Sequence, residues 1–355
     1  NDGQIISSVT FVQKKVIVME DAIDLSAEGT ANCYMIPEAG WFKFNASVKG
    51  NSQEPVGELS GVEVIWETFN TNEKPQEGDI ISKVLLSDNY VYLKTSDGYK
   101  NGNALIAVKD INGVILWSWH IWITAYNPSI EYDTYTNSGA IMMNRDLGAL
   151  SNDLDSDKAV GLFYQWGRKD PFVNDLYMKT NPENTRDVIE AENNIGTISY
   201  SIANPTTFIT YQAHNGEDWL MEHDDNLWND KKTIYDPCPT GWKVPFSINS
   251  NTSTWYNFTS AKDAEIHINK KGILFGSYYS TPDTWYRISG RISGKSGETE
   301  KDGTSYGTES LWWSNNVSKH GYPYGFEVMN DGDGFVTYGV SIGKATGNKV
   351  RCIKE

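Results

Sequence analysis

The chain has 355 residues, of which 39% are hydrophobic and 21% are charged, and 46 acidic against 30 basic side chains give a formal net charge of −16. This composition excludes a disordered chain, and the acidic excess argues against nucleic acid as a partner because like charges repel phosphate backbones. No stretch approaches the roughly 18–20 apolar residues of a membrane helix, so we expect no transmembrane segment. The length predicts two domains of about 100–200 residues each.

Short runs of β-branched and aromatic residues, separated by turn residues, fill the first third of the sequence. In one run Val62, Val64 and Trp66 alternate with Glu63 and Glu67. This alternation is the period of a strand with one buried face. We therefore expect the three apolar side chains to point into one core.

Residues 103–110 and 114–123 form the clearest pair of predicted strands. Asn112-Gly113 between them predicts a two-residue hairpin turn, because both residues tolerate the positive φ that such a turn requires. Several short strands with frequent turns and no helical periodicity predict a β-sandwich. We expect this sandwich to occupy residues 1–127.

A mixed α and β pattern follows the predicted linker at residues 126–129. Asp157 is expected to cap a short helix over residues 158–166, and residues 174–204 are polar enough to be a surface insertion. We therefore expect an α+β domain over residues 128–355. Further strands are predicted at residues 272–276, 285–288, 311–314, 324–328 and 350–353.

Five motifs follow one another in this second part: MNRDLGAL (143–150), LFYQWGRKDPF (162–172), YDPCPTGWKVP (235–245), LWWSNN (311–316) and KVRCI (349–353). The series resembles the Fibrobacter succinogenes major domain, which occurs in surface proteins of Bacteroidetes-type bacteria and is related in fold to C-type lectins. The resemblance implies a C-type-lectin-like domain over residues 128–355. ANCYMI, FNASVKGN and VILWSWHIWIT also resemble the domain that often precedes it, which implies an immunoglobulin-like or fimbrillin-like sandwich for residues 1–127.

The three cysteines are too few for a disulfide-rich scaffold, and their spacing fits no zinc site. Cys238 and Cys352 lie in two of the motifs that carry the resemblance, and an exported protein meets oxidising conditions. We therefore expect a disulfide between Cys238 and Cys352, with Cys33 left as a buried thiol. The alternative is three reduced cysteines, because sequence does not settle pairing.

The LWWSNN motif stands where C-type lectins carry a Trp-Asn-Asp motif for sugar and calcium. The acidic ligand is missing here, so calcium-dependent chelation of a sugar is not expected. One interpretation is that Trp312 or Trp313 stacks on a sugar face, and the other is that these rings pack in the core. The ligand surface is expected near Trp312, Trp313, Asn315, Asn316, Tyr322 and Tyr324.

Calcium is the one cofactor that the sequence suggests. Asp331 and Asp333 alternate with glycines, so that two carboxylates and several carbonyl groups can converge on a hard cation. The trailing glutamate of a full calcium loop is missing, and the alternative is a glycine-rich hairpin turn.

Catalytic motifs are missing from the sequence, which has no Gly-x-Ser-x-Gly elbow, no His-Glu-x-x-His and no phosphate-binding glycine loop. Formylglycine-generating enzymes share the broader lectin-like fold but use a pair of neighbouring thiols, whereas Cys238 and Cys352 stand in structural surroundings. We therefore expect a binding protein and not an enzyme. The two carboxylates of a glycosidase, however, carry no motif that sequence alone could exclude.

The resemblance implies an exported bacterial protein, located extracellularly at the outer-membrane surface. Its expected function is non-covalent recognition of a glycan or of a host or bacterial surface protein, as an adhesin or pilus-associated subunit, with other pilus subunits as further partners. One alternative is a glycan-capture component of a surface polysaccharide-utilisation system. A further alternative is a carbohydrate-active enzyme.

Overall fold

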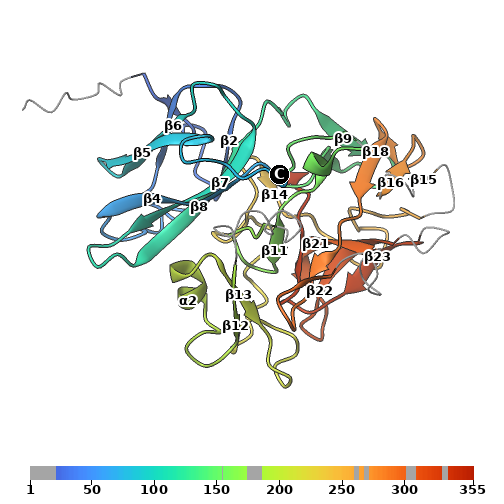
Figure 1. Cartoon of the computed structure of the whole chain (residues 1–355). Coiled ribbons are helices and arrows are strands. Elements are labelled where there is room, and N and C mark those ends of the chain that lie inside the picture. The colour runs from blue at the N-terminus through green and yellow to red at the C-terminus, as the bar shows by residue number, and fades with distance from the viewer. Residues whose placement is uncertain are drawn as a thin grey trace, which may run out of the picture.

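The computed structural model describes residues 21–153, 155–173, 186–259, 264–267, 272–300, 309–329 and 335–355 (Figure 1). These residues fold almost entirely into β-sheets. Their helices are one short α-helix, α2 (Ile198–Ala203), and one 3-10 turn, η1 (Asp157–Ala159). Neither has the length or hydropathy of a segment that crosses a bilayer.

Two four-stranded sheets lie face to face at the upper left of Figure 1. Their strands are β1 (Ile23–Asp24), β2 (Cys33–Ile36), β3 (Trp41–Asn45), β4 (Gly61–Thr68), β5 (Ile81–Ser87), β6 (Tyr90–Thr95), β7 (Gly102–Lys109) and β8 (Ile115–Ile123). One sheet has the order β1-β3-β6-β5 and the other β2-β8-β7-β4. Apolar side chains such as Phe44 and Trp119 fill the space between them. The arrangement is consistent with a β-sandwich, whereas the boundary after residue 127 stays a prediction.

The predicted hairpin joins β7 and β8, but its loop has three residues instead of two. Asp110 N donates to Val114 O at 2.9 Å, and Gly113 N donates to Asp110 O at 3.1 Å. Of the loop residues Ile111, Asn112 and Gly113, only Gly113 has a positive φ, at +83°. The Asp110 carboxylate also accepts hydrogen bonds from the backbone of Asn112 and Val114. These bonds select a three-residue turn that ends in a left-handed glycine.

A bulge in β4 places Trp66 on the face opposite the predicted one. The register of β4 with β7 shifts between Val64 and Trp66. Val62 and Val64 pack against the core between the two sheets, whereas Trp66 belongs to a second core on the outer side. An extra residue in one strand reverses the side to which the following side chains point.

The sheet that contains β7 and β8 is buried on both faces. Trp117, Trp119 and Ile121 of β8 face the core of the sandwich. Trp122 and Leu105 face the other way and join the core of the C-terminal part of the chain. This sheet is therefore shared by two hydrophobic cores.

Polar groups fix the outer face of this sheet. Lys169 and Asp170 form an ion pair of 2.6 Å with side chains only 2% and 4% exposed. The Ser118 hydroxyl of β8 donates to Asp170 and accepts from the Lys169 ammonium, both at 2.6 Å. His120 Nε2 lies 2.9 Å from Asn103 Oδ1, and burial lowers the pKa of His120 to about 3. The imidazole is therefore neutral at physiological pH, and the Lys169 and Asp170 charges form a pair with hydrogen-bond partners.

The remaining strands form four further sheets. They are β9 (Tyr132–Tyr135), β10 (Ile141–Met143), β11 (Phe163–Gln165), β12 (Asp187–Glu190), β13 (Thr207–Thr210), β14 (Trp242–Lys243), β15 (Ala264–His267), β16 (Gly272–Phe275), β17 (Ser280–Thr281), β18 (Thr284–Arg287), β19 (Arg291–Ile292), β20 (Thr299–Glu300), β21 (Glu309–Val317), β22 (Pro323–Met329), β23 (Phe335–Ser341), β24 (Gly347–Lys349) and β25 (Ile353–Lys354). The largest sheet has the order β20-β19-β24-β21-β22-β23, with β11 beside β24. The others are β14-β25-β10-β9-β17, β15-β16-β18 and the parallel pair β12-β13.

The helix predicted over residues 158–166 is wrong. Ser156, and not Asp157, caps the short turn η1 by accepting a hydrogen bond from Lys158 N at 3.2 Å. The chain then extends into β11, which pairs with β24, because a short buried strand carries no period that distinguishes it from a helix. Since α2 and η1 are the helices of the described residues, the α+β class expected for residues 128–355 finds no support.

The motifs that carry the family resemblance meet inside the C-terminal part. Asp146 accepts hydrogen bonds from Trp312 Nε1 at 2.7 Å and from Arg351 Nε at 2.9 Å. The Trp166 indole donates to the Ser314 carbonyl at 2.8 Å. These bonds connect four of the five motifs. Their residues therefore build the core of this part of the chain.

The fifth motif is connected by a disulfide. Cys238 and Cys352 are bonded, with Cα atoms 6.1 Å apart and a sequence separation of 114, and Cys33 is a buried free thiol. The Asp236 carboxylate accepts hydrogen bonds from Cys238 N at 2.8 Å and Val244 N at 2.9 Å. The predicted pairing is confirmed, and it attaches the C-terminal segment to the proline-rich corner.

Replacing Cys238 and Cys352 together by alanine is expected to lower the free energy of unfolding by about 4–5 kcal/mol, because the bridge closes a loop of more than a hundred residues in the unfolded chain. Urea denaturation of the oxidised proteins measures this loss. Cys33→Ala is the matched control and should cost less. Equal losses in the two variants, or three free thiols in the unfolded wild type, would contradict the prediction.

Candidate functional site

Both tryptophans expected at the ligand surface are buried. Trp312 and Trp313 are 0% exposed, because β21 lies between β24 and β22 in the interior of the largest sheet. Trp312 Nε1 donates to Asp146, and Trp313 Nε1 donates to the Tyr164 carbonyl, both at 2.7 Å. Neither ring presents a face to solvent. The interpretation as sugar-stacking residues is therefore wrong, and the alternative of core packing holds.

The two asparagines of the same motif hold neighbouring segments in place. Asn315 is 2% exposed, and its Nδ2 donates to the carbonyl groups of Asn229 and Val244, both at 3.1 Å. Asn316 is half-buried, and its Oδ1 accepts a hydrogen bond from Ser247 N at 3.0 Å. These contacts give both side chains a structural role beside the proline-rich corner.

The calcium prediction falls outside the structure, because Asp331 and Asp333 lie outside the described residues. Within the ranges that are described, no group of three or more His, Cys, Asp or Glu side chains could hold a metal ion. The calcium site therefore stays a prediction.

A cleft of about 500 Å³ opens beside β21 and β22. Leu311, Val340 and Ile342 contribute its apolar surface, and Ser341 and Thr346 contribute hydroxyl groups. Its charged lining comes from Glu217, Arg291, Lys295, Glu300, Glu309 and Glu327. The cleft thus combines apolar side chains with four carboxylates.

Two neighbouring antiparallel strands supply the inner carboxylates. Glu309 begins β21, and Glu327 of β22 pairs with Leu311, so that the two glutamates are diagonal neighbours. Because side chains alternate along a strand, Glu309 and Leu311 share one face and Trp312 takes the other. Trp312 packs there in an aromatic core. One strand thus contributes to the core on one side and to the cleft on the other.

Arg291 of β19 holds two of the cleft glutamates. Its Nε lies 2.7 Å from Glu300 and its Nη1 lies 2.9 Å from Glu309. Burial raises the pKa of Glu309 to about 7, although the Arg291 charge acts in the opposite direction. Burial also raises the pKa of Glu327. Carboxylates perturbed in this way within a cleft are typical of a functional site.

Tyrosines stand at the rim of the cleft. Tyr211 lines it, and burial raises the pKa of the Tyr211 phenol, helped by the nearby Glu217 and Tyr322. Tyr324 pairs in the ladder with Ser341, which lines the cleft. Tyr322 and Tyr324, both half-buried, therefore lie next to the cleft, although neither is among its lining residues.

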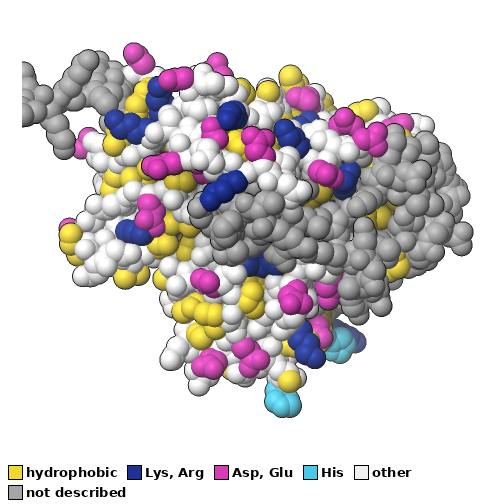
Figure 2. All heavy atoms as spheres, viewed as in Figure 1, with side chains coloured by type: hydrophobic (Ala, Val, Ile, Leu, Met, Phe, Trp, Pro, Cys, Tyr) yellow, Lys and Arg dark blue, Asp and Glu magenta, His cyan; other side chains and the backbone are white. Residues whose placement is uncertain are grey.

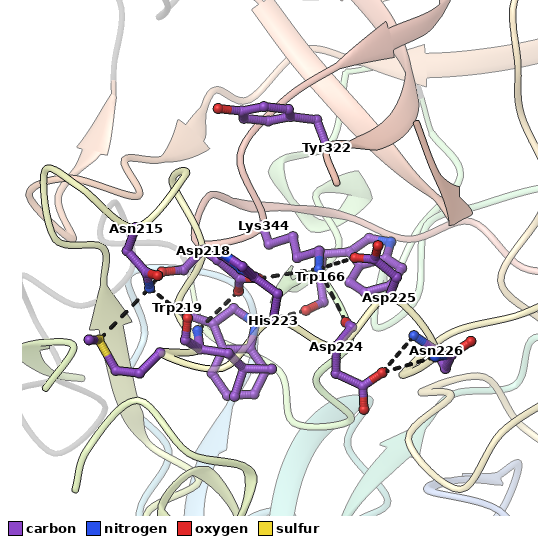
Figure 3. A network of polar contacts seen from close by, with 12 residues as sticks. Trp166, Asn215, Asp218, Trp219, His223, Asp224, Asp225, Asn226, Tyr322 and Lys344 are labelled. Atoms are coloured by element: carbon purple, nitrogen blue, oxygen red, sulfur yellow. Dashed lines mark hydrogen bonds and ion pairs between the residues drawn. The ribbon is translucent and has the colours of Figure 1, made fainter. Parts of the chain in front are cut away.

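A polar network supports the segment that carries Glu217 (Figure 3). The Asp218 carboxylate lies 3.2 Å from the Lys344 ammonium and 2.8 Å from His223 Nδ1. Lys344 is 2% exposed and lies over the Trp166 ring, 5.0 Å from its centroid. The Tyr322 ring lies across from Lys344 in the same view. This network fixes the backbone that follows Glu217.

The charged residues of the cleft were not recognised from sequence. Arg291, Glu300 and Glu309 match no motif, because the cleft assembles them from three different strands. One usable signal exists: Glu309 and Glu327 lie on consecutive strands, and pairing these strands as a hairpin places both carboxylates on one face.

No family model, no curated protein and no solved structure matches the chain. The resemblance to the Fibrobacter succinogenes major domain therefore rests on its five motifs. Of the residues in these motifs, only Leu311 lines the cleft, so the chemistry of the cleft is argued from its own residues.

The pKa of Glu309 is open to direct measurement, and Glu67 on β4 supplies a matched control, because burial raises both to about 7. A ¹³C NMR titration of labelled glutamate carboxyls should show two resonances with midpoints near 7. Glu309→Gln should remove one of them and Glu67→Gln the other. Titration of both groups near 4.5, the usual value for glutamate, would contradict the assignment.

The sign of the pH effect on stability follows from the same shift. A carboxyl whose pKa is higher in the folded state binds its proton more tightly there, so its stabilising contribution is complete below pH 4.5 and is lost as the pH rises to about 7. The unfolding free energy of Glu309→Gln should therefore depend less on pH across this window than that of the wild type.

Proposed function

We propose that this chain binds a glycan non-covalently in the cleft formed by Glu309, Glu327 and Arg291. A sugar presents hydroxyl groups and apolar C–H faces together, and it needs convergent polar groups beside apolar and aromatic surface. The observation that carries the proposal is this combination in one cleft of about 500 Å³. The carboxylates would accept hydrogen bonds from sugar hydroxyl groups. The Tyr211 ring would pack against an apolar face of the sugar.

The proposal includes an exported, cell-surface location. The disulfide between Cys238 and Cys352 supports it, because such bonds persist mainly in oxidising compartments. In this reading the N-terminal sandwich is immunoglobulin-like, residues 128–355 are C-type-lectin-like, and the protein is an adhesin or pilus-associated subunit. A glycan-capture role in a polysaccharide-utilisation system would use the same cleft.

Local contacts rather than a long-range field would select the ligand. Figure 2 shows acidic side chains interspersed with lysine and arginine over the described part of the face in view. The electric fields of such interspersed positive and negative charges cancel beyond about one Debye length, which is roughly 8–10 Å in physiological salt.

Glycoside hydrolysis is the second candidate function. Glu309 and Glu327 are two carboxylates in one cleft, both with pKa values raised by burial, which is the pattern that a general acid and its partner require. Binding is preferred because Arg291 already holds Glu309 in an ion pair of 2.9 Å, so that this carboxyl is not free to approach a leaving-group oxygen.

A glycan array, run with and without calcium, identifies a ligand and should show binding of at least one glycan class. Tyr211→Ala and Tyr322→Ala should each weaken that binding by about threefold to tenfold, because each removes an aromatic surface beside the cleft. Titration calorimetry measures the change. Tyr132→Ala, which removes an exposed tyrosine of β9 outside the cleft lining, should leave affinity unchanged.

Two results would count against the proposal. Equal losses of affinity in all three tyrosine variants would show that binding occurs elsewhere. Release of reducing ends from the bound glycan, lost in Glu309→Gln, would favour the hydrolase.

A further inference from the structure

The charges of the cleft do not balance. Four of its lining residues are acidic and two are basic: Glu217, Glu300, Glu309, Glu327, Arg291 and Lys295. Of the two cations, the half-buried Arg291 is already paired with Glu300 and Glu309, and Lys295 is exposed. Glu327 has no ion pair within the described residues, and the Arg291 charge acts on it only from a longer distance.

The surroundings of Glu327 make this lack of a partner costly. The side chain is half-buried, and within the described part of the chain it has no hydrogen-bond or ion-pair partner. Its neighbours in the ladder are the buried, apolar Leu311 on one side and Thr337 on the other. Partial burial without an ion pair disfavours the charged form of a carboxylate. A cationic group on a ligand would remove this cost.

The rest of the lining indicates which cation fits. Tyr211 supplies an aromatic ring in the same cleft, and aromatic faces attract ammonium groups. Ser293, Ser341 and Thr346 add hydroxyl groups that can bond to further polar atoms of a ligand. A compact ligand with an ammonium group and several hydroxyl groups meets all of these features, which a lysine side chain with its long apolar stem does not.

We propose that the glycan bound in this cleft carries a free amino group, and that its ammonium pairs with Glu327. The inference rests on the proposed glycan-binding function and specifies its ligand class as an amino sugar. An N-acetylated sugar has a neutral amide at the same position. It would leave the Glu327 carboxylate unpaired and would add an acetyl group to the cleft.

Two trisaccharides with the same backbone test this at neutral pH and constant ionic strength. Titration calorimetry compares the trimer of glucosamine with the trimer of N-acetylglucosamine. The amino form should bind the wild-type protein about tenfold or more tightly than the acetylated form, because only the amino form makes a charge-assisted hydrogen bond. This comparison requires no variant and is independent of any effect on folding.

A pair of isosteric variants separates local pairing from general attraction between a cationic ligand and an acidic protein. Glu327→Gln and Glu28→Gln each remove one negative charge from a chain of net charge −16, and Glu28 is exposed in the N-terminal part. The net charge of the protein changes equally in both variants, whereas only Glu327→Gln removes a carboxylate from the cleft. Glu327→Gln should reduce binding of the amino trimer by about tenfold to a hundredfold, and Glu28→Gln should leave it within error.

Each contrary outcome identifies which claim fails. Equal binding of both trimers, or equal effects of the two variants, overturns the amino-sugar inference and leaves the glycan-binding function standing. Binding of neutral glycans alone has the same meaning. If neither trimer nor any glycan on the array binds, the proposed function fails together with the inference. Binding of a lysine peptide in place of the amino trimer overturns the sugar assignment.

Discussion

One buried carboxylate, Asp146, organises the C-terminal part of the chain. It accepts hydrogen bonds from Arg351 and Trp312, and it lies 3.8 Å from the Lys349 ammonium. Burial lowers the pKa of Lys349 to about 7, with the Asp146 charge acting in the opposite direction. A charge in such a position is tolerated only when its partners are buried with it. The contact therefore requires β21 and the C-terminal segment to stand next to the loop after β10.

The cleft depends on this core, because β21 belongs to both. Trp312 points into the aromatic core, which fixes the strand, and Glu309 and Leu311 then point into the cleft from its opposite face. Trp312 of the LWWSNN motif determines where the strand lies. Glu309 before the motif and Leu311 at its start contribute to what the cleft can bind. Alternate side chains of β21 therefore pack in the core or line the cleft.

The shared sheet of β7 and β8 imposes a second constraint, on the relation of the two parts of the chain. Its inner face completes the sandwich, and its outer face carries Trp122 into the C-terminal core. The Lys169–Asp170 ion pair is bonded to Ser118 of β8. A shift of the sheet relative to the C-terminal part would leave these buried charges without their Ser118 partner, so the contact permits one orientation. Asn32 adds two hydrogen bonds across the same contact, to the carbonyl groups of Ile234 and Asp236.

The sequence by itself determined features that depend on neighbours along the chain: the strands of the N-terminal part and the position of the β7–β8 hairpin. It predicted the bond between Cys238 and Cys352 from the motifs that contain them, and the structure settled this pairing against three reduced cysteines. The tertiary structure alone decided the three-residue turn, the bulge that reverses Trp66, the burial of Trp312 and Trp313, and the meeting of Arg291 with Glu300 and Glu309. Alternation shows that a strand has two faces but not what covers each face. That choice follows from contacts between segments far apart in sequence, which local patterns do not encode.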